Sequence, residues 1–130
     1  ALGTVINASI NNLVDYGYNV SGYDESAVYL SNVPMLNYTW PVANLYYDDG
    51  GLFGSEFVYS TASHNMSRFN HVYKNLVAVY GTPYQVQNLN GGARLATWWG
   101  NNGQYITLSF AGAMANSGGL RYYTTLSFGR

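Results

Sequence analysis

The sequence contains no cysteine, few charges and no long apolar run. Without cysteine, a disulfide framework, a thiolate zinc site and a cysteine nucleophile are all excluded. The apolar runs are only a few residues long, far short of the roughly 20 that a spanning helix requires, so we expect no membrane-spanning segment. Five basic and six acidic residues give a formal net charge of -1. Such a balance provides no basic surface for a phosphate backbone, and we expect no nucleic-acid partner.

Aromatic residues take the place of the missing charges. Charged residues make up 8% of the chain and aromatic residues 17%, with 14 tyrosines, whereas about a quarter of an ordinary soluble domain is charged. The surface must therefore consist largely of Asn, Ser, Thr, Gly and Tyr, which is typical of extracellular proteins and of antibody-like binding surfaces. We expect an exported protein, periplasmic or extracellular, that forms a single domain over residues 1–130.

Residues 63–83 give the clearest helix prediction. Apolar and aromatic side chains recur there at steps of three and four, which places them on one stripe of a helix. The stripe consists of Phe69, Val72, Tyr73, Leu76, Val79 and Tyr80. Ser63 or Ser67 can cap the start, while Gly81 and Pro83 mark the end. Residues 4–17 predict a shorter first helix by the same periodicity, with Thr4 as a plausible cap and Gly17 as its stop.

Aromatic and β-branched segments elsewhere predict strands. They cover residues 27–33, 38–48, 52–60, 93–100, 104–110 and 120–128. Pro41 lies inside the second of these segments and indicates an edge strand or a bulge, because proline has no N–H to donate. Residues 84–92 are interpreted as a polar connector, and no internal repeat is convincing. The predicted fold is α+β, in the order α-β-β-β-α-β-β-β, with an antiparallel sheet of five to six strands, the main helix packed on one face and a short N-terminal helix.

Two turns set the predicted registers. Asp48 to Gly51 form a hairpin turn, and Asn102-Gly103 predicts a two-residue hairpin loop. With that loop, Trp99 faces Ile106 and Trp98 faces Thr107 across the ladder. In the last two strands the alternation directs Ile106, Leu108 and Phe110 toward the helix.

The chain resembles small exported α+β domains of Gram-negative bacteria, many of them uncharacterised. The resemblance rests on the helix ending Tyr80-Gly81-Thr82-Pro83, on Thr97-Trp98, and on the strand with Ile106 and Leu108. It implies a fold similar to the BamE-like and beta-lactamase-inhibitor-like domains, which act by binding other proteins. Unlike the lipoproteins among them, this chain has no cysteine to acylate.

The histidines, acids and serines, which are the residue types most used in catalysis, show no active-site pattern. If His64 and His71 share the central helix, they lie about 10.5 Å apart along its axis, too far to share one metal. The acids Asp24, Glu25, Asp48 and Asp49 fall in turns, and Glu56 is expected to face solvent opposite a buried Phe57. No serine-nucleophile or phosphate-loop motif is present. We therefore expect no enzyme, no catalytic residue, no metal site and no cofactor.

The outward face of the C-terminal strands is the candidate site, because exposed aromatics flanked by hydroxyls anchor protein partners and stack on sugars. The predicted residues are Trp98, Tyr105, Thr107, Arg121, Tyr123 and Thr125. We predict an exported, non-enzymatic binding or adaptor module whose partner is another protein or a glycan. One alternative is a structural subunit of an extracellular filament or layer, self-associating through an edge near Pro41, and another is a carbohydrate-binding domain that uses Trp98 and its tyrosine neighbours. A covering segment or a second subunit over this face remains the structural alternative.

Overall fold

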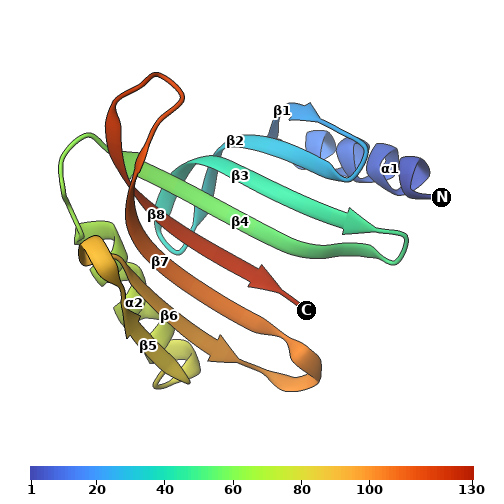
Figure 1. Cartoon of the computed structure of the whole chain (residues 1–130). Helices are drawn as coiled ribbons and strands as arrows, with labels where there is room; N and C mark the ends of the chain where they lie inside the picture. Colours follow the sequence, from blue (N-terminus) through green and yellow to red (C-terminus); the bar gives the residue numbers. More distant parts are fainter.

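The computed structural model describes residues 1–130 and shows one eight-stranded antiparallel sheet with two helices (Figure 1). The helices are α1 (Leu2–Asp15) and α2 (Ser67–Tyr80). The strands are β1 (Asn19–Tyr23), β2 (Ala27–Met35), β3 (Tyr38–Asp48), β4 (Gly51–Thr61), β5 (Gln85–Asn88), β6 (Arg94–Trp99), β7 (Tyr105–Met114) and β8 (Leu120–Gly129). They lie in the order β1-β2-β3-β4-β8-β7-β6-β5. Each helix has 14 residues, and neither has the length and apolar character needed to cross a membrane.

The predicted sheet of five to six strands is wrong, because β1 and β5 were missed. Both are edge strands: β1 pairs only with β2, and β5 pairs only with β6. Most side chains of β5 are exposed, and none in β1 is buried. A strand that buries so little needs no apolar alternation, so the polar sequences of β1 and β5 carried no strand signal.

The chain contains an architectural repeat that its sequence does not show. A helix followed by four strands occurs twice, first as α1 with β1 to β4 and then as α2 with β5 to β8. The two halves join in the middle of the sheet, where β4 pairs antiparallel with β8. Hydrophobic periodicity sets such an architecture, and many different residues satisfy the same periodicity.

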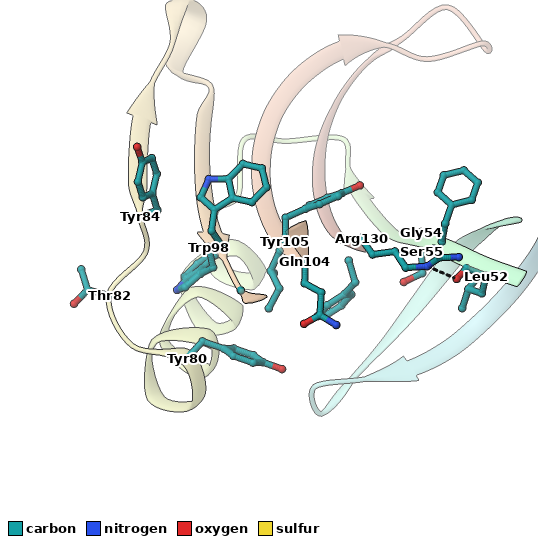
Figure 2. A pocket seen from close by; sticks show the side chains of 16 residues that line it. Leu52, Gly54, Ser55, Tyr80, Thr82, Tyr84, Trp98, Gln104, Tyr105 and Arg130 are labelled. Carbon is teal, nitrogen blue, oxygen red and sulfur yellow. Dashed lines mark hydrogen bonds between the residues drawn. The ribbon is translucent and has the colours of Figure 1, made fainter. Parts of the chain in front are cut away.

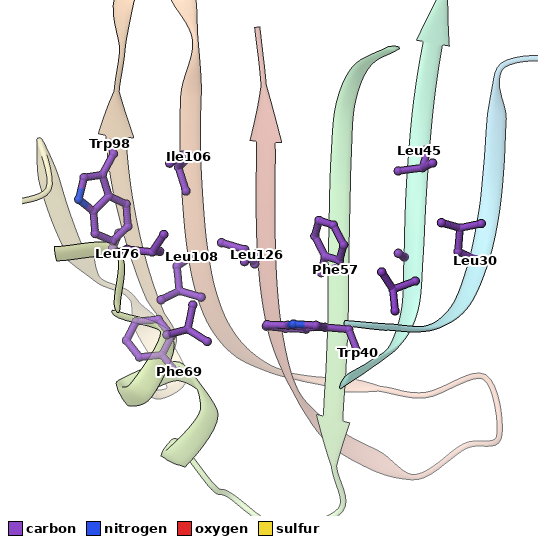
Figure 3. Close-up of a cluster of buried hydrophobic side chains, with 14 of the residues drawn as sticks. Leu30, Trp40, Leu45, Phe57, Phe69, Leu76, Trp98, Ile106, Leu108 and Leu126 are labelled. Carbon is purple, nitrogen blue, oxygen red and sulfur yellow. The ribbon is translucent and has the colours of Figure 1, made fainter. Parts of the chain in front are cut away.

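Both helices pack on the same face of the sheet, which we call the inner face; the opposite side is the outer face. One core cluster of 18 buried residues joins Ile6 of α1 to Phe69, Val72 and Leu76 of α2. Figure 3 shows Phe69 and Leu76 of α2 beside side chains of the sheet. The sheet supplies Val28, Leu30, Val33, Trp40, Ala43, Leu45, Tyr47, Phe57, Ala96, Trp98, Ile106, Leu108, Phe110 and Leu126. Burial of these side chains is the main stabilising contribution to the fold.

The helix predicted over residues 63–83 exists as α2, but it is shorter than predicted. The expected contrast between a main helix and a short N-terminal helix is wrong, because α1 and α2 each have 14 residues. Phe69, Val72 and Leu76 are buried as predicted, whereas Val79 is 67% exposed and Tyr80 56%. Gly81 ends the helix with φ 84° and donates its N–H to the carbonyl of Val77. Positive φ suits glycine because it has no Cβ.

Pro41 does not lie in an edge strand, since β3 lies between β2 and β4. The residue opposite Pro41 in β2 is Asn32, which has φ 55°. These two residues do not pair, although the residues on either side of them do. The β3–β4 pairing begins only at Val42. Neither ladder therefore needs the N–H that proline lacks.

The loop between β6 and β7 is longer than predicted, and this shifts the register by one residue. Gly100 donates its N–H to the carbonyl of Gln104 at 2.8 Å, which leaves three residues in the loop. Asn102 has φ 58° and Gly103 φ 76°. Trp98 therefore pairs with Ile106 and Trp99 with Tyr105. The two-residue loop had predicted Trp98 opposite Thr107 and Trp99 opposite Ile106. A slip of one residue exchanges the faces of every side chain in a strand.

Candidate binding surfaces

Trp98 lies on the inner face, so its predicted place in an outward-facing site is wrong. Only 4% of the residue is exposed, and its indole Nε1 donates to the carbonyl of Gly81 at 2.9 Å. The ring centroid is 5.8 Å from that of Tyr73 on α2. Trp98 thus attaches β6 to the end of α2, and the adjacent Trp99, 58% exposed, lies on the outer face instead.

The other five predicted residues share the outer face of β7 and β8. Tyr105 and Thr107 belong to β7, and Arg121, Tyr123 and Thr125 belong to β8. In the antiparallel register they alternate with the buried residues of the same strands, because Ile106 pairs with Phe128 and Leu108 with Leu126. Their predicted common face is therefore confirmed, while their role in binding stays a prediction.

Outer-face side chains form rows across five strands, β6, β7, β8, β4 and β3. One row is mainly of hydroxyl-bearing and amide residues: Thr97, Thr107, Ser127, Glu56 and Asn44. The next row toward the β6–β7 loop is Trp99, Tyr105, Gly129, Gly54 and Tyr46. Strands about 4.8 Å apart give each row a length of roughly 19 Å. Of these ten residues the predicted site contained only Tyr105 and Thr107 on β7, and none of those on β6, β8, β4 or β3.

The two charged groups of this central area are engaged within the sheet. The carboxylate of Glu56 accepts a hydrogen bond from Asn44 Nδ2 at 2.9 Å and another from the Tyr46 hydroxyl at 3.4 Å. Burial raises the pKa of the Tyr46 hydroxyl, and the adjacent Glu56 carboxylate raises it further. Arg121 donates to the hydroxyl of Ser60 at 2.9 Å and to its carbonyl at 3.1 Å. Each of these charged groups is thus hydrogen-bonded to neutral groups within the sheet, and the two are opposite in sign.

A pocket of about 640 Å³ lies at the end of the sheet where the β3–β4 hairpin, the β6–β7 loop and the carboxyl end of β8 meet (Figure 2). The inner-face row of Trp98, Ile106 and Phe128 forms its floor, and Ser55 continues this row at the rim. Residues 80–84, at and after the end of α2, stand on one side, and Leu52 stands on the other. Sequence reasoning missed this pocket, because its walls come from segments far apart in the chain.

The histidines do not form a site with each other. His64 precedes α2 and packs its ring against Phe110 and Tyr122, with centroids 5.0 and 5.2 Å away. His71 lies on α2, and its Nδ1 is 2.5 Å from the Tyr38 hydroxyl. No group of three or more His, Asp or Glu side chains is arranged to hold a metal ion.

A scan against models of protein families gave no match to this chain, and comparisons with curated proteins and with solved structures gave none either. The resemblance to BamE-like and beta-lactamase-inhibitor-like domains therefore stays a prediction.

Proposed function

We propose that the protein is an exported, non-enzymatic binding module that holds another protein on the outer face of its sheet. The observation that carries the proposal is the placement of both helices on the inner face. Their placement leaves the outer face without a helix over it. A sheet face rich in tyrosine and hydroxyl groups, and open over several strands, is a surface suited to a partner.

The composition of the face favours a protein partner of low charge. The charged groups of the face, Glu56 and Arg121, are opposite in sign and each is hydrogen-bonded within the sheet, so the face has no net charge to attract a polyanion or a polycation. Tyr105, Trp99 and Tyr123 supply large, rigid contact area with little entropy to lose, and the hydroxyls between them supply adaptable hydrogen bonds. Eight strands span about 34 Å, enough for the roughly 800 Å² per partner of a standard interface.

The engagement of these same charged groups also supports a binding role without catalysis. A general acid or base must reach a reacting group, and the carboxylate of Glu56 is instead held by Asn44 and Tyr46. Export is supported by the composition, in which charged residues are only 8%.

Site-specific photocrosslinking tests the proposal. A benzophenone side chain at Tyr123, on the outer face, is compared with one at Tyr16, which is 84% exposed at the end of α1. In periplasmic and extracellular fractions of the producing cells, we expect one protein crosslinked from position 123 and not from position 16. The purified partner should then bind the Thr125→Lys variant at least about tenfold more weakly, while Asn12→Lys on α1 leaves its affinity unchanged. Equal loss in both variants, or no protein specific to position 123, overturns the proposal.

Open sheet edges favour a second candidate, a structural subunit that associates with copies of itself. β1 and β5 each have a strand on one side only, and a free edge is a template for pairing with another chain. Size-exclusion chromatography and negative-stain images distinguish the two. Filaments or a concentration-dependent oligomer support the structural role, and a monomer at all concentrations removes it.

A further inference from the structure

We infer that the pocket at the hairpin end of the inner face is a separate binding site for a neutral saccharide. Its volume of about 640 Å³ falls in the range of small-molecule sites, roughly 300 to 1,000 Å³. The inference rests on the inner-face row of Trp98, Ile106 and Phe128, although Trp99 and Tyr105 of the outer face also line the pocket near the β6–β7 loop. Figure 2 shows the lining residues together.

The pocket exists because the helices leave this part of the inner face uncovered. α2 ends at Tyr80, and Gly81 then turns the chain toward β5. α1 packs over β1 to β3, on the far half of the sheet. At the opposite end of the same gap, Arg68 fills the space, with its guanidinium carbon 3.7 Å from the ring centre of Tyr59 and 5.1 Å from that of Trp40. No such side chain fills the hairpin end.

The floor of the pocket is apolar and held in place. Ile106 and Phe128 pair across β7 and β8, and the Phe128 ring packs edge-on against Phe57 at 6.1 Å. Beside them, the Trp98 indole is anchored by its hydrogen bond to Gly81. A fixed aromatic and aliphatic floor can pack against the C–H face of a sugar ring without reorganising first.

The rim of the pocket carries neutral hydrogen-bonding groups. Gln104 and Thr82 are exposed, and Ser55 is half-buried. The Tyr80 side chain points from the end of α2 toward the other residues that line the pocket. Amide and hydroxyl groups both donate and accept hydrogen bonds, which matches the hydroxyls at the edge of a sugar ring. An apolar floor with a rim of this kind fits a saccharide better than it fits a purely apolar molecule, which would leave the rim groups without partners.

Charge selects a neutral sugar over an acidic one. Arg130 is the one charged residue that lines the pocket. Its Nε donates to the carbonyl of Leu52 at 3.3 Å, and its Nη2 is 3.5 Å from Asp48 Oδ1. The Asp48 carboxylate offsets the guanidinium charge at the pocket entrance, so an anionic ligand gains little from Arg130.

Titration of the full chain with cellotetraose, maltotetraose, xylotetraose and chitotetraose tests the inference by two-dimensional amide NMR. At least one tetraose should shift the resonances of Gln104, Ile106 and Phe128 in a saturable manner, while those of Thr125 on the outer face stay unchanged. Tyr80→Ala should weaken that binding about tenfold. Tyr16→Ala is the matched control, since it removes an exposed tyrosine at the end of the other helix.

Three results would overturn the inference. They are the absence of shifts from all four sugars at about 10 mM, equal weakening by Tyr80→Ala and Tyr16→Ala, and shifts confined to the outer face. Thr125→Lys should leave sugar binding unchanged, which separates this site from the proposed protein-binding face.

Discussion

The ring of Tyr105 lies over the backbone of Gly129, its cross-strand partner on β8. A Cβ built on Gly129 would overlap the ring atoms of Tyr105. Gly54, on the other side of Gly129, continues the row to Tyr46. Two glycines in the middle of the sheet are thus flanked by two tyrosines, and at Gly129 the aromatic ring occupies the space that a side chain would take.

Gly129→Ala should therefore destabilise the protein by about 1 kcal/mol, because the added methyl group forces the Tyr105 ring to move. Urea unfolding measures the change. Gly119→Ala is the control, since a Cβ there meets nothing within 4 Å, and we expect a change below about 0.5 kcal/mol. In a double-mutant cycle, Tyr105→Ala should remove most of the cost of Gly129→Ala; additive effects would show that the ring is not what the methyl group displaces.

The neighbouring tryptophans Trp98 and Trp99 should respond very differently to replacement. Trp98→Phe removes the bond to the Gly81 carbonyl and part of a buried ring, so we expect a loss of about 2 to 3 kcal/mol in the free energy of unfolding. Trp99→Phe removes a ring that is 58% exposed and should cost less than about 0.5 kcal/mol. Equal costs in urea unfolding would contradict the register in which Trp98 faces α2.

This pair also shows how far the sequence carries a prediction. Periodicity placed Phe69 and Leu76 on the buried side of α2, and alternation placed Ile106 and Leu108 on the inner face, because burial leaves a repeated pattern. The face of Trp98 depended on whether the loop at Asn102 has two or three residues. Both lengths suit the sequence there, so a purely local ambiguity reversed the face.

The missed features are ones that leave no local pattern. β1 and β5 are edges that bury little, so their residues need not alternate. The shared outer face of β7 and β8 was predictable, because each strand alternates by itself. The pocket could not be predicted, because it depends on where α2 ends relative to the β3–β4 hairpin. The position of the helix end beside the hairpin arises only in the folded chain.

Arg68 should be a major link between the two halves of the molecule. Its guanidinium lies over the rings of Tyr59 at 3.7 Å and Tyr38 at 4.3 Å, and it donates to the carbonyl of Thr39 at 2.8 Å. Burial lowers the pKa of this guanidinium, which reflects the water it has lost. We expect Arg68→Ala to cost about 2 kcal/mol, through the lost cation–π contacts and the carbonyl left without its donor.

Arg68→Lys should recover less than half of that loss, because an ammonium group cannot stack flat on a tyrosine ring while it donates to Thr39. Lys74→Ala is the control, as Lys74 is exposed on the same helix, and its unfolding free energy should change by less than about 0.5 kcal/mol. Full recovery with lysine would show that only the charge at position 68 matters.

The turn between β1 and β2 should weaken at both extremes of pH. The Tyr29 hydroxyl donates to Asp24, and the N–H groups of Ser26 and Ala27 donate to the same carboxylate at 2.9 and 2.8 Å. The bond from Tyr29 is the main cause of a lowered pKa at Asp24, and the bond to Asp24 is the main cause of a raised pKa at Tyr29. Both shifts favour the pair of a charged carboxylate and a neutral phenol.

The two pKa shifts predict that stability is lost at opposite ends of the pH range. Because the folded-state pKa of Asp24 is lowered from 3.8, its contribution is present above that pH and is lost as the pH falls through the lower folded value. Because the pKa of Tyr29 is raised from 10.0, its contribution is present below pH 10 and is lost as the pH rises through the higher folded value. Amide hydrogen exchange of β1, followed against pH, should show protection falling at both ends. Asp24→Asn should flatten the acid limb and Tyr29→Phe the alkaline one. An acid limb unchanged in Asp24→Asn would assign the pH dependence to other groups.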